Sequence, residues 1–491
     1  MKNIAFQPEF RPALPSVLGS KDYRDFRETL IEADRILVES GIEDAVVRRH
    51  MESITEEMSD RKRAFRTKTI RKALRHSILL SLSQLSVREL ATRLADSRLY
   101  QWFTSSEQID AVRPVAKSSI ERFEKMFPEG EIVELIHEIN RLTMDAEKSQ
   151  SILFLEKPLN VEQVFADSTC VESNIHLPVD WVLLRDAVRT LTKGVSLIRA
   201  QGLVNRMASP RQFMKQMNQL CIAMTHARHT RKSKRTRKDV LRKMKKLSKI
   251  VSLHASRHRD LLSKNWEQTD WSEAQAAQVL ARIDNVLSLL PTAIHQAHER
   301  LIGERKVKND KKIFSLYEPD VHVIVRGKAG AQVEFGNGLY LVEQADGFIV
   351  DWQFMKDQPP SDGSLVKGSL ERIEANYAKP LSFAGDRGFH SQANVLHLEE
   401  QGIFNAICPK SIKKLEESLK DVRFRDMQTR RASTEARIAI LTNGYVGTPL
   451  QSKGFKNRTT RIEWCILIHN LWKLAAKVVA RRRETEAAQA A

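Results

Sequence analysis

The sequence of 491 residues contains few glycines, prolines and cysteines. Its 19 Gly and 15 Pro disfavour an all-β protein rich in tight turns and favour long helices. The four cysteines are widely spaced and form no C-x-x-C pair, which argues against a disulfide framework and a structural zinc site. This usage fits a reducing cytoplasm. At roughly 150 residues per domain, the length suggests about three domains.

Long hydrophobic runs are also missing. The longest, residues 466–480, is interrupted by Lys473 and Lys477, and a helix that spans a bilayer needs about 20 apolar residues. The first twenty residues carry Glu9 and three prolines where a secretory signal would be apolar. We therefore expect a cytoplasmic protein with no membrane segment.

Acidic residues are fewer than basic ones: the chain has 61 Asp+Glu and 80 Lys+Arg, which gives a formal net charge of +19. Such a surplus favours a polyanionic partner, and without a membrane segment that partner is nucleic acid. Residues 228–249 hold 12 Lys+Arg against Asp239 alone, a local net charge of 12 − 1 = +11. A solvated helical arm is the alternative interpretation. The DNA contacts expected here are Arg231, Lys232, Lys234, Arg235, Arg237 and Lys238.

Residues 23–148 have helical periodicity with few glycines or prolines. Ser86 followed by Glu89 has the Ser-x-x-Glu form of a capping box, which predicts a helix that starts at Ser86 and runs towards Leu99. With the preceding helix it would form a helix-turn-helix-like pair, and an ordinary helical hairpin is the alternative. In the first case Arg88 and Arg93 would contact DNA.

The rest of the chain mixes strands and helices. Residues 161–173 read as a strand and are followed by about 130 residues of helical pattern. Residues 321–355 then read as a three-strand meander with glycine turns. The remaining expectations are a helix at 364–378, a strand at 381–389, a helix at 392–401, a strand at 403–410, and helices at 411–419, 429–441 and 461–483. This order predicts an α/β fold with helices packed on a mixed sheet.

Two acidic residues are expected at strand ends, where polar site residues of such sheets gather. Asp167 ends the run VEQVFA and Asp386 ends LSFAG. Taken singly, each is more simply a turn or cap residue. As a pair beside a polyanion they suggest phosphodiester chemistry, in which carboxylates hold two Mg²⁺ ions.

A third carboxylate is offered by Glu435, in the expected helix RRASTEARIAIL. It has Arg430, Arg431 and Arg437 beside it, and arginine pairs with phosphate oxygens in a fixed fork. The alternative is a solvent-exposed helix with an i, i+4 ion pair between Arg431 and Glu435. Glu416 and Glu417 look more like a solvated helix face.

Four blocks around these residues resemble DDE transposases of bacterial insertion sequences, especially the ISNCY-like group. They are ADSTCVESNIHLPVD, the strand block RGKAGAQVEFG, FAGDRGFHSQAN, and RRASTEARIAIL with its trailing His-Asn-Leu helix, and they occur in the family's order between about residues 60 and 480. The first block matches at Asp167, Thr169, Val171, Glu172, Asn174, Ile175, His176, Pro178 and Asp180.

The resemblance implies a ribonuclease H-like mixed-sheet core with an N-terminal all-helical domain and a large helical insertion between the first and second core strands. In that fold the first Asp lies on the first strand, the second just after the fourth, and the Glu on a later helix. The expected domains are 1–60, an N-terminal, partly helical segment; 61–150, helix-turn-helix-like; 155–176, the first core strand; 177–310, the basic insertion; 311–478, the remaining core; and 479–491, a charged tail.

The resemblance also implies that Asp167, Asp386 and Glu435 are the catalytic residues and bind two Mg²⁺ or Mn²⁺ ions. Supporting roles would fall to Glu172, His176, Arg387 and Arg431, and further DNA contacts to Arg326 and Lys328 of the glycine-rich turn. The expected partners are double-stranded DNA, both terminal inverted repeats and target, and further copies of the chain in a homodimer or higher oligomer. The expected location is the bacterial nucleoid.

The glutamate block departs from the family pattern. Relatives carry a lysine after the glutamate that can touch the phosphates of the transposon end, and this chain lacks it, with Thr442 following its helix. A catalytically weak or inactive DNA-binding protein derived from a transposase is therefore the alternative function.

Overall fold

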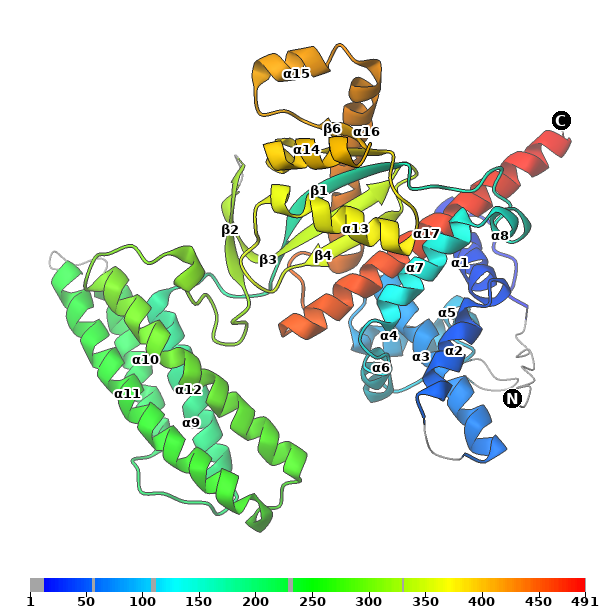
Figure 1. Cartoon of the computed structure of the whole chain (residues 1–491). Helices are drawn as coiled ribbons and strands as arrows, with labels where there is room; N and C mark the ends of the chain where they lie inside the picture. The colour runs from blue at the N-terminus through cyan, green and yellow to red at the C-terminus, as the bar shows by residue number, and fades with distance from the viewer. Residues whose placement is uncertain (1–12, 55–57, 107–111, 228–232, 329–330, 491) are drawn as a thin grey trace.

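In the computed structural model, residues 13–54, 58–106, 112–227, 233–328 and 331–490 are described. This part of the chain is 65% helical and contains a mixed sheet of six strands, which confirms the α/β expectation. Helices surround the sheet, and a separate group of long helices projects from it (Figure 1).

The N-terminal part is helical, as its periodicity predicts. Its helices are α1 (Lys21–Glu39), α2 (Ile42–Glu52), α3 (Asp60–Ser83), α4 (Val87–Asp96), α5 (Arg98–Phe103), α6 (Lys117–Glu124), α7 (Glu131–Met144) and α8 (Ala146–Ser151). The capping box at Ser86 is confirmed, since Ser86 Oγ accepts from the Glu89 amide and the Glu89 carboxylate accepts from the Ser86 amide. The helix ends at Asp96 rather than near Leu99, because Ser97 caps the start of α5.

The sheet has the order β2-β3-β1-β5-β6, and β4 also pairs with β3. Its strands are β1 (Gln163–Glu172), β2 (His322–Lys328), β3 (Ala331–Gln344), β4 (Ile349–Phe354), β5 (Ser382–Gly385) and β6 (Phe404–Ile407). β3 runs antiparallel to β1, β2 and β4, whereas β5 is parallel to both β1 and β6. The meander and the two later strands are therefore as expected.

Helices cover both faces of the sheet, and alternate residues of β1 point to opposite sides. Val164 and Ala166 belong to the hydrophobic core under α13 (Val366–Asn376) and α14 (Gln392–Glu400). Phe165 belongs to the core under α16 (Val422–Leu441), which also contains Phe424 and Met427. The short helix α15 (Ile412–Ser418) connects β6 to α16.

The region between β1 and β2 is a helical insertion, as expected. Its described helices are α9 (Asp180–Ala200), α10 (Pro210–His226), α11 (Ser233–Asn265) and α12 (Glu273–Leu301). These helices have a hydrophobic core of their own, which includes Leu191, Met217, Leu241 and Ile283. They form the bundle that projects away from the sheet in Figure 1.

The last helix, α17 (Phe455–Ala490), joins the sheet to the N-terminal helices. Its Trp464 shares one hydrophobic core with Leu341 of β3 and with Leu30 and Ile70 of α1 and α3. The expected charged tail, 479–491, is helical as far as Ala490, and its arginines 482 and 483 pair with acidic residues of α1. Among the described residues, no helix is both long and apolar enough to cross a membrane.

Candidate active site

The parallel pairing of β1 with β5 places two of the three candidate carboxylates, Asp167 and Asp386, side by side on neighbouring strands. The parallel register pairs Phe165 with Ala384, an offset of 384 − 165 = 219 residues. Asp167 and Asp386 differ by the same 219, so Asp386, directly after β5, continues that register beside Asp167. Adjacent strands lie about 4.8 Å apart. Both residues keep the parity of Phe165 and Ala384, and therefore share the face that α16 covers.

The position of Asp167 corrects one expectation. It lies within β1, opposite Leu341 of β3, and does not end the strand. The strand continues because Thr169, Cys170 and Val171 are buried and pair with the next residues of β3. Asp386 does follow its strand directly, as expected.

The charges of the other two candidate carboxylates act on Asp167. Burial is the largest cause that raises the pKa of Asp167, to about 6, and the negative charges of Asp386 and Glu435 raise it further. The Ser168 amide, which donates to Asp167 Oδ1 at 2.7 Å, and the Arg431 guanidinium lower it. Residues 219 and 268 positions away in the sequence thus act on Asp167.

Glu435 is the outermost of the three. Its side chain is 70% exposed, and its Oε1 lies 3.9 Å from Nη1 of Arg431. The i, i+4 ion pair that sequence reasoning offered as the alternative is therefore present. Arg431 itself is mostly buried, and its Nε donates to Gln428 Oε1 at 3.2 Å. Arg431 thus acts electrostatically on both Glu435 and Asp167.

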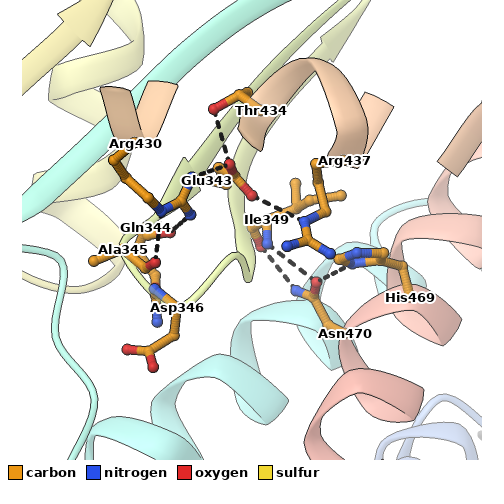
Figure 2. A network of polar contacts seen from close by, with 10 residues as sticks. All are labelled: Glu343, Gln344, Ala345, Asp346, Ile349, Arg430, Thr434, Arg437, His469 and Asn470. Atoms are coloured by element: carbon orange, nitrogen blue, oxygen red, sulfur yellow. Dashed lines mark hydrogen bonds and ion pairs between the residues drawn. The ribbon is translucent and has the colours of Figure 1, made fainter. Parts of the chain in front are cut away.

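The other two arginines of the helix do not join the site. Arg430 and Arg437 both bind Glu343, a buried carboxylate on β3 (Figure 2). The grouping of three arginines around Glu435 is corrected, because residues 430 and 437 are seven apart and share a helix face that 431 does not. Glu343 was missed, although an acidic residue within the apolar run LYLVEQ was a usable signal.

The structure places the expected supporting residues at different distances from the carboxylates. Glu172 ends β1, five residues beyond Asp167, which is about 16 Å along a strand and on the opposite face. His176 lies beyond it and is exposed. Arg387 is exposed in the turn after Asp386, whose Oδ1 accepts from the Gly388 amide at 2.7 Å. Asp386 therefore also caps a turn, as its local alternative predicted.

A further carboxylate, Asp362, borders the site and was missed by sequence reasoning. Its Oδ1 accepts a hydrogen bond from Ser168 Oγ at 2.8 Å. A Cβ atom at Gly388 would lie 2.6 Å from Asp362 Oδ2 and 3.0 Å from Asp386 Oδ1. Both carboxylates thus lie against this glycine, and neither would tolerate a side chain there. Asp362 lies in the polar stretch PPSDGS, where its sequence signal is only that of a turn residue.

The donor set suits a hard divalent cation, since Mg²⁺ and Mn²⁺ prefer carboxylate oxygens. In the described ranges, no group of three or more His, Cys, Asp or Glu side chains is arranged to hold a metal ion. The exposure of Glu435 is consistent with this, because its side chain is turned towards solvent and Arg431. Asp167 and Asp386 are the carboxylates best placed to share a cation.

The basic segment of the insertion is partly neutralised. Lys234 and Lys238 on α11 bind Glu304 at 2.6 and 2.7 Å, and these contacts lower the pKa of Glu304 to about 2. Arg235 is exposed and Arg237 is half-buried. Arg231 and Lys232 lie outside the described residues. Four further cations of the segment 228–249 are exposed on α11, namely Arg242, Lys243, Lys246 and Lys249.

The remaining candidate DNA contacts lie on two other elements. Arg88 and Arg93 are exposed on α4, and Arg93 lies 3.6 Å from Asp96. Arg326 and Lys328 lie in β2, and their side chains are outside the described part of the structure.

Comparisons of the chain with models of protein families, with curated proteins and with solved structures gave no match. The described structure is that of an α/β protein with a mixed sheet and a helical insertion.

Proposed function

We propose that this chain is a DDE transposase with a ribonuclease H-like core, which binds insertion-sequence ends and catalyses metal-dependent DNA cleavage and strand transfer. The observation that carries the proposal is that the charges of Asp386 and Glu435 both act on the buried Asp167. They are the three acidic residues that the resemblance selects, and the pKa of Asp167 responds to both of the others. The shared register of the two aspartates supplies the geometric support.

The positions of the carboxylates support a ribonuclease H-like core. Asp167 lies on the first strand of the sheet and Glu435 on a later helix, as the resemblance implies. Asp386 follows the fifth described strand and not the fourth. The extra strand is accounted for by β2, which pairs with the first half of β3 while β4 pairs with the second half.

In this proposal Asp167, Asp386 and Glu435 hold the divalent ions. When bound, two such ions supply activation of the attacking water or 3′-hydroxyl and stabilise the leaving oxygen. The chain's own contribution is a buried carboxylate beside further negative charge: burial first, and then the charges of Asp386 and Glu435, raise the pKa of Asp167, and a bound cation would relieve both effects. Arg431 is placed to pair with a phosphate oxygen of the DNA.

The insertion is the proposed source of sequence-independent affinity. Its exposed cations on α11 would neutralise DNA phosphates and release counterions, which makes binding sensitive to salt. Two transposon ends must be brought together for transposition, so a homodimer or higher oligomer on double-stranded DNA belongs to the same proposal.

The test is a cleavage assay on DNA that carries the inverted repeats flanking the gene, with Mg²⁺ or Mn²⁺ present. We expect nicking at the repeat ends and joining of the freed 3′-ends to target DNA. Asp167→Asn and Asp386→Asn should abolish both products, whereas Glu416→Gln, an exposed control on α15, should leave them unchanged. Equal cleavage by wild type and Asp167→Asn would overturn the proposal.

A second function, a transposase-derived DNA-binding protein without cleavage activity, is favoured by the glutamate region. Glu435 is 70% exposed and paired with Arg431, and the lysine of the family pattern is missing. In that case the wild type binds the repeats in a mobility-shift assay but yields no cleavage product with either metal.

A further inference from the structure

A single buried carboxylate holds one face of the helix that carries Glu435. Glu343 of β3 is 1% exposed and accepts hydrogen bonds from Arg430 Nη1 at 2.9 Å, Thr434 Oγ1 at 2.8 Å and Arg437 Nε at 3.0 Å (Figure 2). All three donors come from α16. The three donors therefore meet at the two carboxylate oxygens of one residue.

The three donors define one face of α16, because they are spaced at i, i+4 and i+7. At 100° per residue, Arg431 and Glu435 lie roughly 100° further around the helix than Arg430 and Thr434 respectively. The face that Glu343 holds therefore sets the direction in which Arg431 and Glu435 point. If α16 rotated about its own axis by one residue, or about 100°, the face that carries Arg431 and Glu435 would change places with the face that contacts Glu343.

A second contact holds the far side of α16. Gln428 Nε2 donates to the carbonyl oxygens of Gly385, at 3.2 Å, and Ala406, at 2.5 Å. These residues belong to β5 and β6, whereas Glu343 is on β3, so α16 spans the sheet from β3 to β6. Between the two anchors the Arg430 guanidinium lies over the Phe165 ring of β1, 4.7 Å from its centroid.

The turn between β3 and β4 is itself held firmly, so Glu343 is a fixed anchor. Arg430 donates to the carbonyl oxygens of Gln344 and Ala345 in that turn. From the other side, Asn470 of α17 accepts from the Ile349 amide and donates to its carbonyl oxygen (Figure 2). Gly347 has φ +81°, and a Cβ there would lie 2.4 Å from Arg437 Nη2, so the turn fits closely under the arginine.

We propose that Glu343 is a positioning residue of the candidate active site, which sets the rotation of α16 and thereby places Arg431 and Glu435 beside Asp167. Its role in catalysis rests on the proposed function, whereas its effect on the position of α16 does not. Glu343 touches neither DNA nor the reacting atoms in this proposal. It acts through the helix.

The test compares Glu343→Gln with a matched control, Asp351→Asn. Asp351 of β4 is another buried carboxylate of the same sheet, and it binds Arg372 and Ser369 of α13 on the opposite face. Both substitutions remove a buried charge and leave arginine without its counter-ion, so both should lower the melting temperature. Only Glu343→Gln loosens α16.

Three measurements separate positioning from general stability. For Glu343→Gln we expect a fall in kcat of about 10²-fold, a loss that a displacement near 1 Å can cause, with an unchanged KM for DNA. We also expect faster amide hydrogen exchange along α16, which Asp351→Asn should leave unchanged, because Glu343 accepts from three side chains of that helix. Thr434→Val, which removes one donor of the three, should change kcat and the exchange rate less and in the same direction.

Equal losses of kcat in Glu343→Gln and Asp351→Asn, or an exchange rate of the α16 amides that Glu343→Gln and Thr434→Val leave unchanged, would overturn the proposal. Should the wild type show no cleavage, the proposed function fails, and hydrogen exchange alone decides whether Glu343 positions α16. If Glu343→Gln does not fold, Thr434→Val carries the same comparison.

Discussion

Replacing Asp167 with asparagine should stabilise the protein while it removes the proposed activity. The pKa of Asp167 is raised to about 6 from an ordinary 3.8, mainly because the carboxyl is buried. The folded state therefore binds this proton more tightly than the unfolded state does. Stability from this group is complete below pH 3.8 and is lost as the pH rises to about 6. Asparagine cannot ionise, so the free energy of unfolding of the variant does not fall for this reason as the pH rises.

The size of the stabilisation follows from the rise in the pKa of Asp167 from 3.8 to about 6. At 1.36 kcal/mol per unit, the ionised carboxylate costs about 3 kcal/mol at pH 7 and above. With an unfolding entropy of about 2.1 cal/mol/K per residue, 491 residues unfolding as one unit convert this into about 3 °C. Asparagine keeps the Oδ1 atom that accepts from the Ser168 amide, so this hydrogen bond is preserved.

The assay is thermal unfolding of wild type and Asp167→Asn from pH 4 to pH 8, in EDTA. We expect the two melting temperatures to agree at pH 4 and the variant to be about 3 °C more stable at pH 7–8. Mg²⁺ should then raise the melting temperature of wild type more than that of the variant. Parallel curves across the whole pH range would show that Asp167 is not held in a buried, negatively charged cluster.

Further predictions concern the helical regions. Arg75→Met should lower the free energy of unfolding by about 3–5 kcal/mol in chemical denaturation, because it leaves the carboxylate of Glu43 buried without its partner. Ser86→Ala should cost about 1 kcal/mol in the same assay, through loss of the capping box, and a change below 0.3 kcal/mol would contradict this. Glu304→Gln should free Lys234 and Lys238, tighten DNA binding and steepen its salt dependence by up to about 2 in log–log slope, whereas unchanged titrations would exclude DNA contact by these lysines.

Sequence periodicity located nearly every element but was weaker at boundaries. The expected helix at 429–441 begins earlier, at Val422, because the Asp421 side chain accepts from the amides of Arg423 and Phe424 and caps it there. The first strand, expected at 161–173, is observed at Gln163–Glu172, so its bounds were close. A helix cap is a local contact that hydrophobic periodicity does not encode, and it moved the start of α16.

The sequence by itself determined the α/β class, the strands and helices, the helical insertion and its charge, because periodicity, caps and glycine turns are local properties. The candidate acidic residues also came from the sequence. Tertiary structure decided which of them meet. The register of β1 and β5 placed Asp386 beside Asp167, and Glu343 drew Arg430 and Arg437 away from Glu435. Such pairings join residues up to 219 positions apart, and they depend on burying apolar faces and satisfying backbone and side-chain hydrogen bonds across the whole sheet, which no local pattern specifies.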